Sequence, residues 1–151
     1  MSYFTLSEFL KDSDVGRPEV GERNIIQKVN FWIDELNKVR SLVGFPIKIT
    51  DSVRWGDGTS QHYYKGQGAI DCRPVDKYNQ DHFYRLGLAL YANPNIKRIC
   101  FYPRGKLFAF GGFHIDAKTP DKQFFISDKD KIIWTPSSIN DLGALLYEPK
   151  P

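Results

Sequence analysis

The sequence contains little cysteine and no Cys-x-x-Cys pair. Only two of its 151 residues are cysteines, Cys72 and Cys100. This scarcity excludes a dense disulfide framework. Because free cysteine is among the most frequently buried residue types, we expect two buried thiols in strands. A single disulfide between the two is the alternative.

Long apolar runs and clusters of one charge are also absent. No apolar stretch approaches the ~20 residues that cross a bilayer, and the first residues carry acids and no apolar run of signal-peptide length. We therefore expect no membrane span, no signal peptide and a chain made in the cytoplasm. The net charge is +3. Because the lysines and arginines form no run or stripe, we expect no nucleic-acid partner.

The residues that are present are typical of a packed globular chain. Hydrophobic residues make up 41% of the sequence and aromatic residues 15%, whereas disordered chains are poor in aromatic residues. No repeat, low-complexity tract or long Pro/Gly linker divides the chain. We therefore predict a single domain over residues 1–151.

Apolar spacing predicts two main helices. A Thr5–Glu8 capping box opens a short helix through about Lys11. Apolar residues at three- and four-residue steps predict a helix from near Asn24 that ends before Gly44. The predicted inner face of this helix comprises Ile25, Ile26, Val29, Trp32, Ile33, Leu36, Val39, Leu42 and Val43. A second helix is predicted over 76–92, with Phe83, Leu86, Leu90 and Tyr91 as its inner face.

Strands are predicted in the remaining apolar segments. They cover residues 46–50, 68–72, 96–102, 106–110, 113–117, 123–126 and 132–134. Two main helices packed on a mostly antiparallel sheet form the α+β pattern. We therefore predict the α+β class.

The three histidines differ in their surroundings. His82 lies in a predicted helix and is expected to be a surface residue. His62 lies in a glycine-rich loop, whereas His114 and Asp71 lie within apolar strands. A buried carboxylate is costly unless it is paired or bound to a metal. Two imidazoles and one carboxylate with an open position are the ligand set of a catalytic zinc site.

A metal-free arrangement is the alternative for the same residues. In it, Asp71 pairs with Arg54 or Arg73, and His114 forms hydrogen bonds within the sheet. The residues alone leave both arrangements open.

Several blocks follow one another in an order known from one enzyme superfamily. They are Phe4–Leu10, the segment Gly44-x-Pro46-Ile47-x-Ile49-Thr50 with Arg54, the segment Ser60-x-His62 followed by Ala69 and Asp71, the segment Phe101-Tyr102-Pro103-Arg104-Gly105, Phe113-His114-Ile115-Asp116, and Trp134. Together they resemble the zinc D-Ala-D-Ala carboxypeptidase and L-Ala-D-Glu endopeptidase superfamily, in its small phage-type branch. The resemblance covers most of the chain.

The resemblance implies a hedgehog/DD-peptidase-like fold and a zinc-dependent activity on peptidoglycan peptides. It implies that His62, Asp71 and His114 bind Zn²⁺, and that Arg54 and Ser60 bind substrate. It also implies a role in phage lysis or in the virion, where other virion proteins are further partners. The expected location is the host cytoplasm and then the cell wall or the virion.

The sequence departs from the family pattern at two points. The interval between His62 and Asp71 is two residues longer than usual in the family. Many members carry an acid shortly before the last histidine, where this chain has Gly111 and Gly112. Asp116 is the nearest substitute, because residues two apart in a strand share a face.

Asp116 therefore has three possible roles. It acts as the general base, or it orients a ligand imidazole, or it forms a salt bridge with Arg54 or Lys118. If the base lies elsewhere, Asp51 and Asp57 are the next candidates. Without a base, the chain is an inert virion, structural or cell-wall-binding protein that retains the fold. A metal-free fold with vestigial residues is the third reading.

Aromatic residues near these segments also have two readings. Trp55, Tyr63, Tyr64 and Tyr102 either line a groove for a glycan-peptide substrate or pack within the domain.

Overall fold

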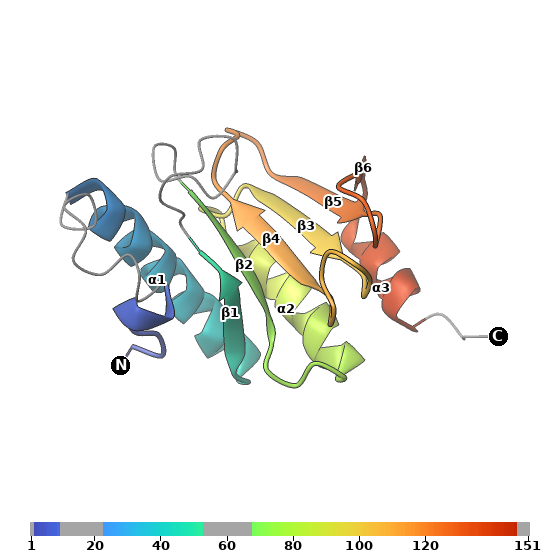
Figure 1. Cartoon of the computed structure of the whole chain (residues 1–151), viewed down its shortest axis with the longest axis horizontal. Coiled ribbons are helices and arrows are strands. Elements are labelled where there is room, and N and C mark those ends of the chain that lie inside the picture. Colours follow the sequence, from blue (N-terminus) through green and yellow to red (C-terminus); the bar gives the residue numbers. More distant parts are fainter. Residues whose placement is uncertain (1, 10–22, 53–67, 148–151) are drawn as a thin grey trace.

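Six strands form one sheet within the described residues, which are 2–9, 23–52 and 68–147 of this computed structural model (Figure 1). The strands are β1 (Ile47–Asp51), β2 (Ala69–Pro74), β3 (Arg98–Tyr102), β4 (Gly112–Asp116), β5 (Gln123–Ser127) and β6 (Trp134–Pro136). Their order across the sheet is β1-β2-β4-β3-β5-β6. Only the β3–β5 pair of these is parallel. The predicted α+β class and the mostly antiparallel sheet are confirmed.

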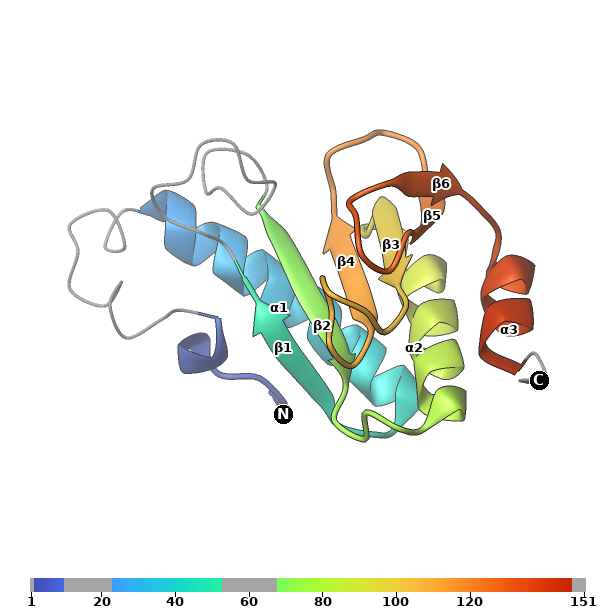
Figure 2. The ribbon, with the colours of Figure 1, turned by 45° about the vertical axis from the view of Figure 1, so that its right-hand side comes forward.

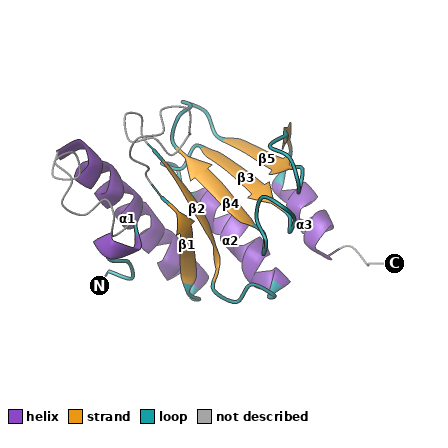
Figure 3. Ribbon diagram, in the orientation of Figure 1, coloured by secondary structure: helices purple, strands orange, loops and turns teal. Residues whose placement is uncertain are grey.

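Three α-helices in the described segments pack on one face of this sheet (Figures 2 and 3). They are α1 (Arg23–Val43), α2 (Gln80–Ala92) and α3 (Ile139–Tyr147). Helix α2 lies in the middle, because it contacts α1, α3, β2 and β3. The opposite face of the sheet is free of helices within the described residues, and the candidate site lies on that face.

Local signals fix the ends of the helices. Helix α1 stops as predicted before Gly44, whose φ of 78° suits a residue without a Cβ. Helix α2 begins later than predicted, because the Asn79 side chain accepts a hydrogen bond from the His82 backbone N–H at 3.0 Å. The Thr5–Glu8 box also forms, with the Glu8 carboxylate accepting the Thr5 N–H at 3.1 Å. It opens only a short 3-10 turn, Leu6–Glu8.

One predicted strand does not form, and one helix is missing from the prediction. Residues 106–110 form turns and no strand, and their apolar side chains Leu107 and Phe110 are exposed. Helix α3 was not predicted. Its start is marked by Ser138 and Asp141, which bond to each other's backbone N–H groups at 3.2 Å and 2.8 Å.

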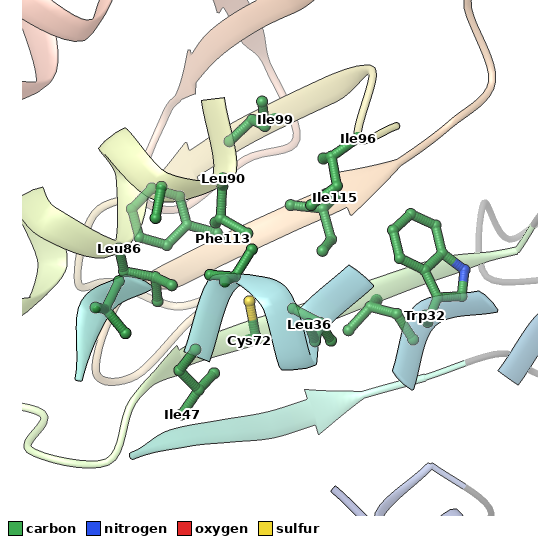
Figure 4. Packing of buried hydrophobic residues seen from close by; sticks show 14 of the residues in the cluster. Trp32, Leu36, Ile47, Cys72, Leu86, Leu90, Ile96, Ile99, Phe113 and Ile115 are labelled. Atoms are coloured by element: carbon green, nitrogen blue, oxygen red, sulfur yellow. The ribbon is translucent and has the colours of Figure 1, made fainter. Parts of the chain in front are cut away.

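The core lies between the helices and the sheet (Figure 4). Trp32 and Leu36 of α1 and Leu86 and Leu90 of α2 are fully buried there. Leu42 and Tyr91 were also expected to face inward, but both are exposed. They lie beside, and not on, the stripe of residues that touches the sheet.

The two cysteines are buried free thiols in strands, as expected. Cys72 belongs to the helix-side core. Cys100 lies opposite His114 in the β3–β4 register, and alternation therefore directs it to the other face. Of the helices in the described part of the chain, none combines the length and apolar character needed to cross a bilayer.

Candidate metal centre

Asp71 and His114 lie side by side on neighbouring strands. The antiparallel register of β2 and β4 places the two residues directly opposite each other. Phe113 and Ile115 on either side of His114 point into the helix-side core. Because side chains alternate along a strand, His114 and Asp71 project from the other face. The apolar neighbours thus hold the register that brings the imidazole to the carboxylate.

Both ring nitrogens of His114 face a carboxylate. Nδ1 lies 3.1 Å from Asp71 Oδ1, and Nε2 lies 3.0 Å from Asp116 Oδ2. The His114 residue is only 5% exposed. Burial by itself would lower the pKa of His114, but the hydrogen bonds and negative charges of Asp116 and Asp71 outweigh it, so the pKa is raised.

Asp116 is held from three sides. The Arg98 guanidinium donates to both carboxylate oxygens, with Nε 2.8 Å from Oδ1 and Nη2 2.6 Å from Oδ2. The Lys118 backbone N–H donates to Oδ1 at 3.1 Å. Burial would raise the pKa of Asp116, but the hydrogen bonds from His114 and Arg98 hold it at about 2. The carboxylate is therefore charged and fully buried.

Trp134 packs against one side of the hydrogen-bonded network of Asp71, His114, Asp116 and Arg98. Its ring centroid lies 5.1 Å from that of His114, and the Arg98 guanidinium lies 5.2 Å from its centroid. The indole N–H donates to the Tyr102 hydroxyl at 2.5 Å. Tyr102 is buried and stacks on Phe108. Tyr102 thus packs beneath the tryptophan and does not offer an open platform for substrate.

Several predicted site residues lie outside the described residues. These are the substrate-binding candidates Arg54 and Ser60, the third ligand His62, the alternative base Asp57, and the aromatic residues Trp55, Tyr63 and Tyr64. The other alternative base, Asp51, pairs with Asp71 in the β1–β2 register.

Arg98 was not among the candidates, although it is the partner of Asp116. The expected partners were Arg54 or Lys118, and Lys118 contributes its backbone N–H. Arg98 lies opposite Asp116 in the β3–β4 register. An arginine and an aspartate in two predicted strands were the available signal, but the sequence does not give the register that joins them.

Arg73 is the alternative partner of Asp71 in the metal-free arrangement, and His82 is the expected surface residue. The Arg73 guanidinium donates to the Pro74 and Val75 carbonyl oxygens at 2.8 Å and 3.2 Å. His82 is not a simple surface residue, because its ring stacks on Phe45 with centroids 3.9 Å apart. The imidazole of His82 is thus part of the α2 packing and lies away from His114.

Asp71 and His114 supply two donor atoms of the kinds that bind zinc, one carboxylate oxygen and one imidazole nitrogen. Ligand atoms about 2.0–2.2 Å from a tetrahedral zinc lie about 3.3–3.6 Å from each other. Asp71 Oδ1 and His114 Nδ1 lie at a hydrogen-bond distance of 3.1 Å, so the two atoms would move apart by a few tenths of an ångström to hold the ion. Asp116 on the other ring nitrogen matches the carboxylate that commonly orients a metal-bound histidine. The described residues alone contain no complete group of three metal-ligating side chains, and the third predicted ligand, His62, is not among them.

Comparisons of the chain with protein-family models, with curated proteins and with solved structures found no match.

Proposed function

We propose that this protein is a zinc-dependent peptidase that cleaves an amide bond in peptidoglycan stem peptides, as a D,D-carboxypeptidase or an endopeptidase, in phage lysis or in the virion. The observation that carries the proposal is the 3.1 Å approach of Asp71 Oδ1 to His114 Nδ1 on one sheet face. The order of the sequence blocks supports the same superfamily and a hedgehog/DD-peptidase-like fold.

The proposed roles follow from the donor set. Asp71 and His114, with His62 as the third ligand, hold the zinc. When bound, zinc polarises the scissile carbonyl and lowers the pKa of water. Arg54 and Ser60 bind the substrate, and the planar guanidinium of Arg54 suits a peptide carboxylate. The segment that carries these residues joins β1 to β2, and β1 ends at Asp51, the register partner of Asp71.

Asp116 is proposed as the residue that positions His114. Its carboxylate accepts hydrogen bonds from Arg98 and from the Lys118 N–H, and it contacts His114 Nε2. A general base needs a free lone pair near the substrate, whereas these contacts occupy both oxygens of Asp116. Zinc at Nδ1 and Asp116 at Nε2 use opposite sides of the same ring.

The second candidate function is a catalytically inert virion, structural or cell-wall-binding protein with the same fold. The backbone at Gly111 and Gly112 favours this inert protein over the peptidase. Gly111 has a φ of 77°, and a Cβ at Gly112 would lie 2.8 Å from the Phe108 ring. An acidic residue is therefore disfavoured at both positions where many family members carry one, so a base has to come from another segment.

Digestion of purified peptidoglycan tests the proposal and separates the two candidates. We expect the zinc-loaded protein to release peptide fragments or D-Ala, a chelator to stop the release, and added zinc to restore it. His114→Ala should be inactive, whereas His82→Gln, which removes a histidine away from the site, should keep the activity. A folded, zinc-loaded wild type that releases nothing contradicts the peptidase and supports the inert protein.

A further inference from the structure

A cavity of about 380 Å³ lies away from Asp71 and His114, at the end of the sheet near α2 and α3. Phe83 of α2 and Phe101 of β3 belong to the helix-side core and line it, together with Leu145 of α3. Its volume is within the range of sites that bind small molecules or short peptide ends. These walls give the cavity an apolar interior.

Two cations stand at this cavity over exposed aromatic rings. Lys77 Nζ lies 3.9 Å from the centroid of Phe110, and the Arg104 guanidinium carbon lies 4.6 Å from that of Tyr78. All four side chains line the cavity. Tyr78 is 67% exposed and Phe110 is 36% exposed. The aromatic rings therefore hold the two charges beside the opening by cation–π contact.

The positive charges lack acidic partners in the described part of the chain. Neither Lys77 nor Arg104 forms an ion pair there. The Arg104 Nη2 group donates to the Lys77 carbonyl oxygen, which ties the two residues together. Asp76, the nearest acid along the chain, accepts the Tyr78 backbone N–H at 3.4 Å. Two cations beside an apolar cavity are complementary to an anion with an apolar body.

We infer that this cavity binds the free C-terminal carboxylate of a peptide that ends in a bulky apolar residue. The apolar side chain fills the space beside Phe83 and Leu145, and the carboxylate meets Lys77 and Arg104. The Gln80 side chain also lines the cavity, and its amide can both donate to and accept from a peptide bond. Capture of a terminal carboxylate is a known mode of peptide recognition.

A carboxylate fits this site better than a phosphate group. Burial of a charge is unfavourable unless the charge is paired, and a monoanion brings less charge to be dehydrated than a phosphate dianion. The guanidinium of Arg104 can pair with either anion, so the apolar walls decide the choice, because a peptide end carries an apolar side chain to fill them and inorganic phosphate does not. The site lies on the helix side of the sheet, so its occupation does not depend on the proposed metal centre.

Calorimetric titration with N-acetyl-Leu-Phe, as the free acid and as the amide, tests the inference. We expect the acid to bind about 10- to 100-fold more tightly than the amide, since hydrogen bonds to charged groups are strong. Inorganic phosphate and 4-phenylbutyrate should bind more weakly than the peptide acid. Failure of the peptide acid to bind, equal binding of acid and amide, or tighter binding of either competitor overturns the inference.

Matched variants locate the binding. Lys77→Gln and Arg104→Gln should each weaken binding of the peptide acid by about 10-fold or more, since each removes one charged hydrogen bond. Lys106→Gln removes the same charge from an exposed residue of the neighbouring turn and should leave the affinity unchanged. A chelator should also leave it unchanged. Equal loss in Lys106→Gln and Lys77→Gln, or loss on addition of the chelator, contradicts the site.

Discussion

At the residue scale, the contacts of Asp116 distinguish its possible roles. Its carboxylate is fully buried and accepts from Arg98 and from a backbone N–H. Arg98 and His114 also keep its pKa at about 2 despite burial, far below the value near operating pH that suits a general base. The geometry therefore favours orientation of His114 over proton transfer.

Asp116→Asn tests this role. The asparagine keeps the size of the side chain but loses the charge that faces His114 and Arg98. We expect the affinity for zinc to fall by about 10- to 100-fold, the usual cost of losing a residue that orients a metal ligand. Competition with a chromophoric chelator measures that affinity.

Asp121→Asn is the matched control, because Asp121 is an exposed acid in the connection after β4. It should bind zinc as the wild type does. Unchanged zinc affinity in Asp116→Asn, together with a rate that falls about 10²- to 10⁴-fold, would instead identify Asp116 as the general base.

At the scale of elements, one buried carboxylate joins α1 to the connection between α2 and β3. Glu35 is 4% exposed and accepts from Asn93 Nδ2 at 2.8 Å, Asn95 Nδ2 at 3.0 Å and Lys38 Nζ at 3.1 Å. Burial would raise the pKa of Glu35, but these hydrogen bonds lower it overall. The charged form therefore contributes to the stability of the fold.

Glu35→Gln should lower the free energy of unfolding by about 1–3 kcal/mol at pH 7, the usual cost of losing a charged hydrogen bond. A pKa lowered on folding gives stability that is present above the unfolded value, about 4.3, and is lost as the pH falls through the folded value. The difference between wild type and variant should therefore shrink below about pH 4. Urea unfolding across the pH range measures it.

Asp34→Asn removes a charge from the neighbouring exposed position of α1. Its effect on stability should be small, since surface substitutions away from special features cost little. A Glu35→Gln effect that is as small as that of Asp34→Asn, or one that grows as the pH falls, would show that the Asn93 and Asn95 contacts do not stabilise the fold.

The elements also show where sequence patterns suffice. Helix α1 followed from its three- and four-residue apolar spacing and from Gly44, which are local signals. Helix α3 is a nine-residue helix whose packing depends on α2. In the 106–110 segment, the four consecutive apolar residues 107–110 imitate a short strand, but residues 105–111 form the turns between β3 and β4. Tertiary context therefore overrides a short apolar pattern.

At the scale of the whole molecule, the candidate site depends on strand order. Alternation within the segment around His114 already predicted that it shares a face with Asp116. That Asp71 and Arg98 come from the strands on either side of β4 follows from the order β2-β4-β3. Contacts such as Arg98 with Asp116 need a register between distant segments, which no local pattern contains.

The zinc content of purified wild type, His114→Ala and His82→Gln tests whether His114 binds zinc. We expect about one zinc per chain in the wild type and in His82→Gln, and none in His114→Ala. Thermal unfolding of each protein verifies that the variants are folded. A folded His114→Ala variant with full zinc content, or a wild type that binds no zinc when it is supplied, would contradict the assignment of His114 and Asp71 as metal ligands.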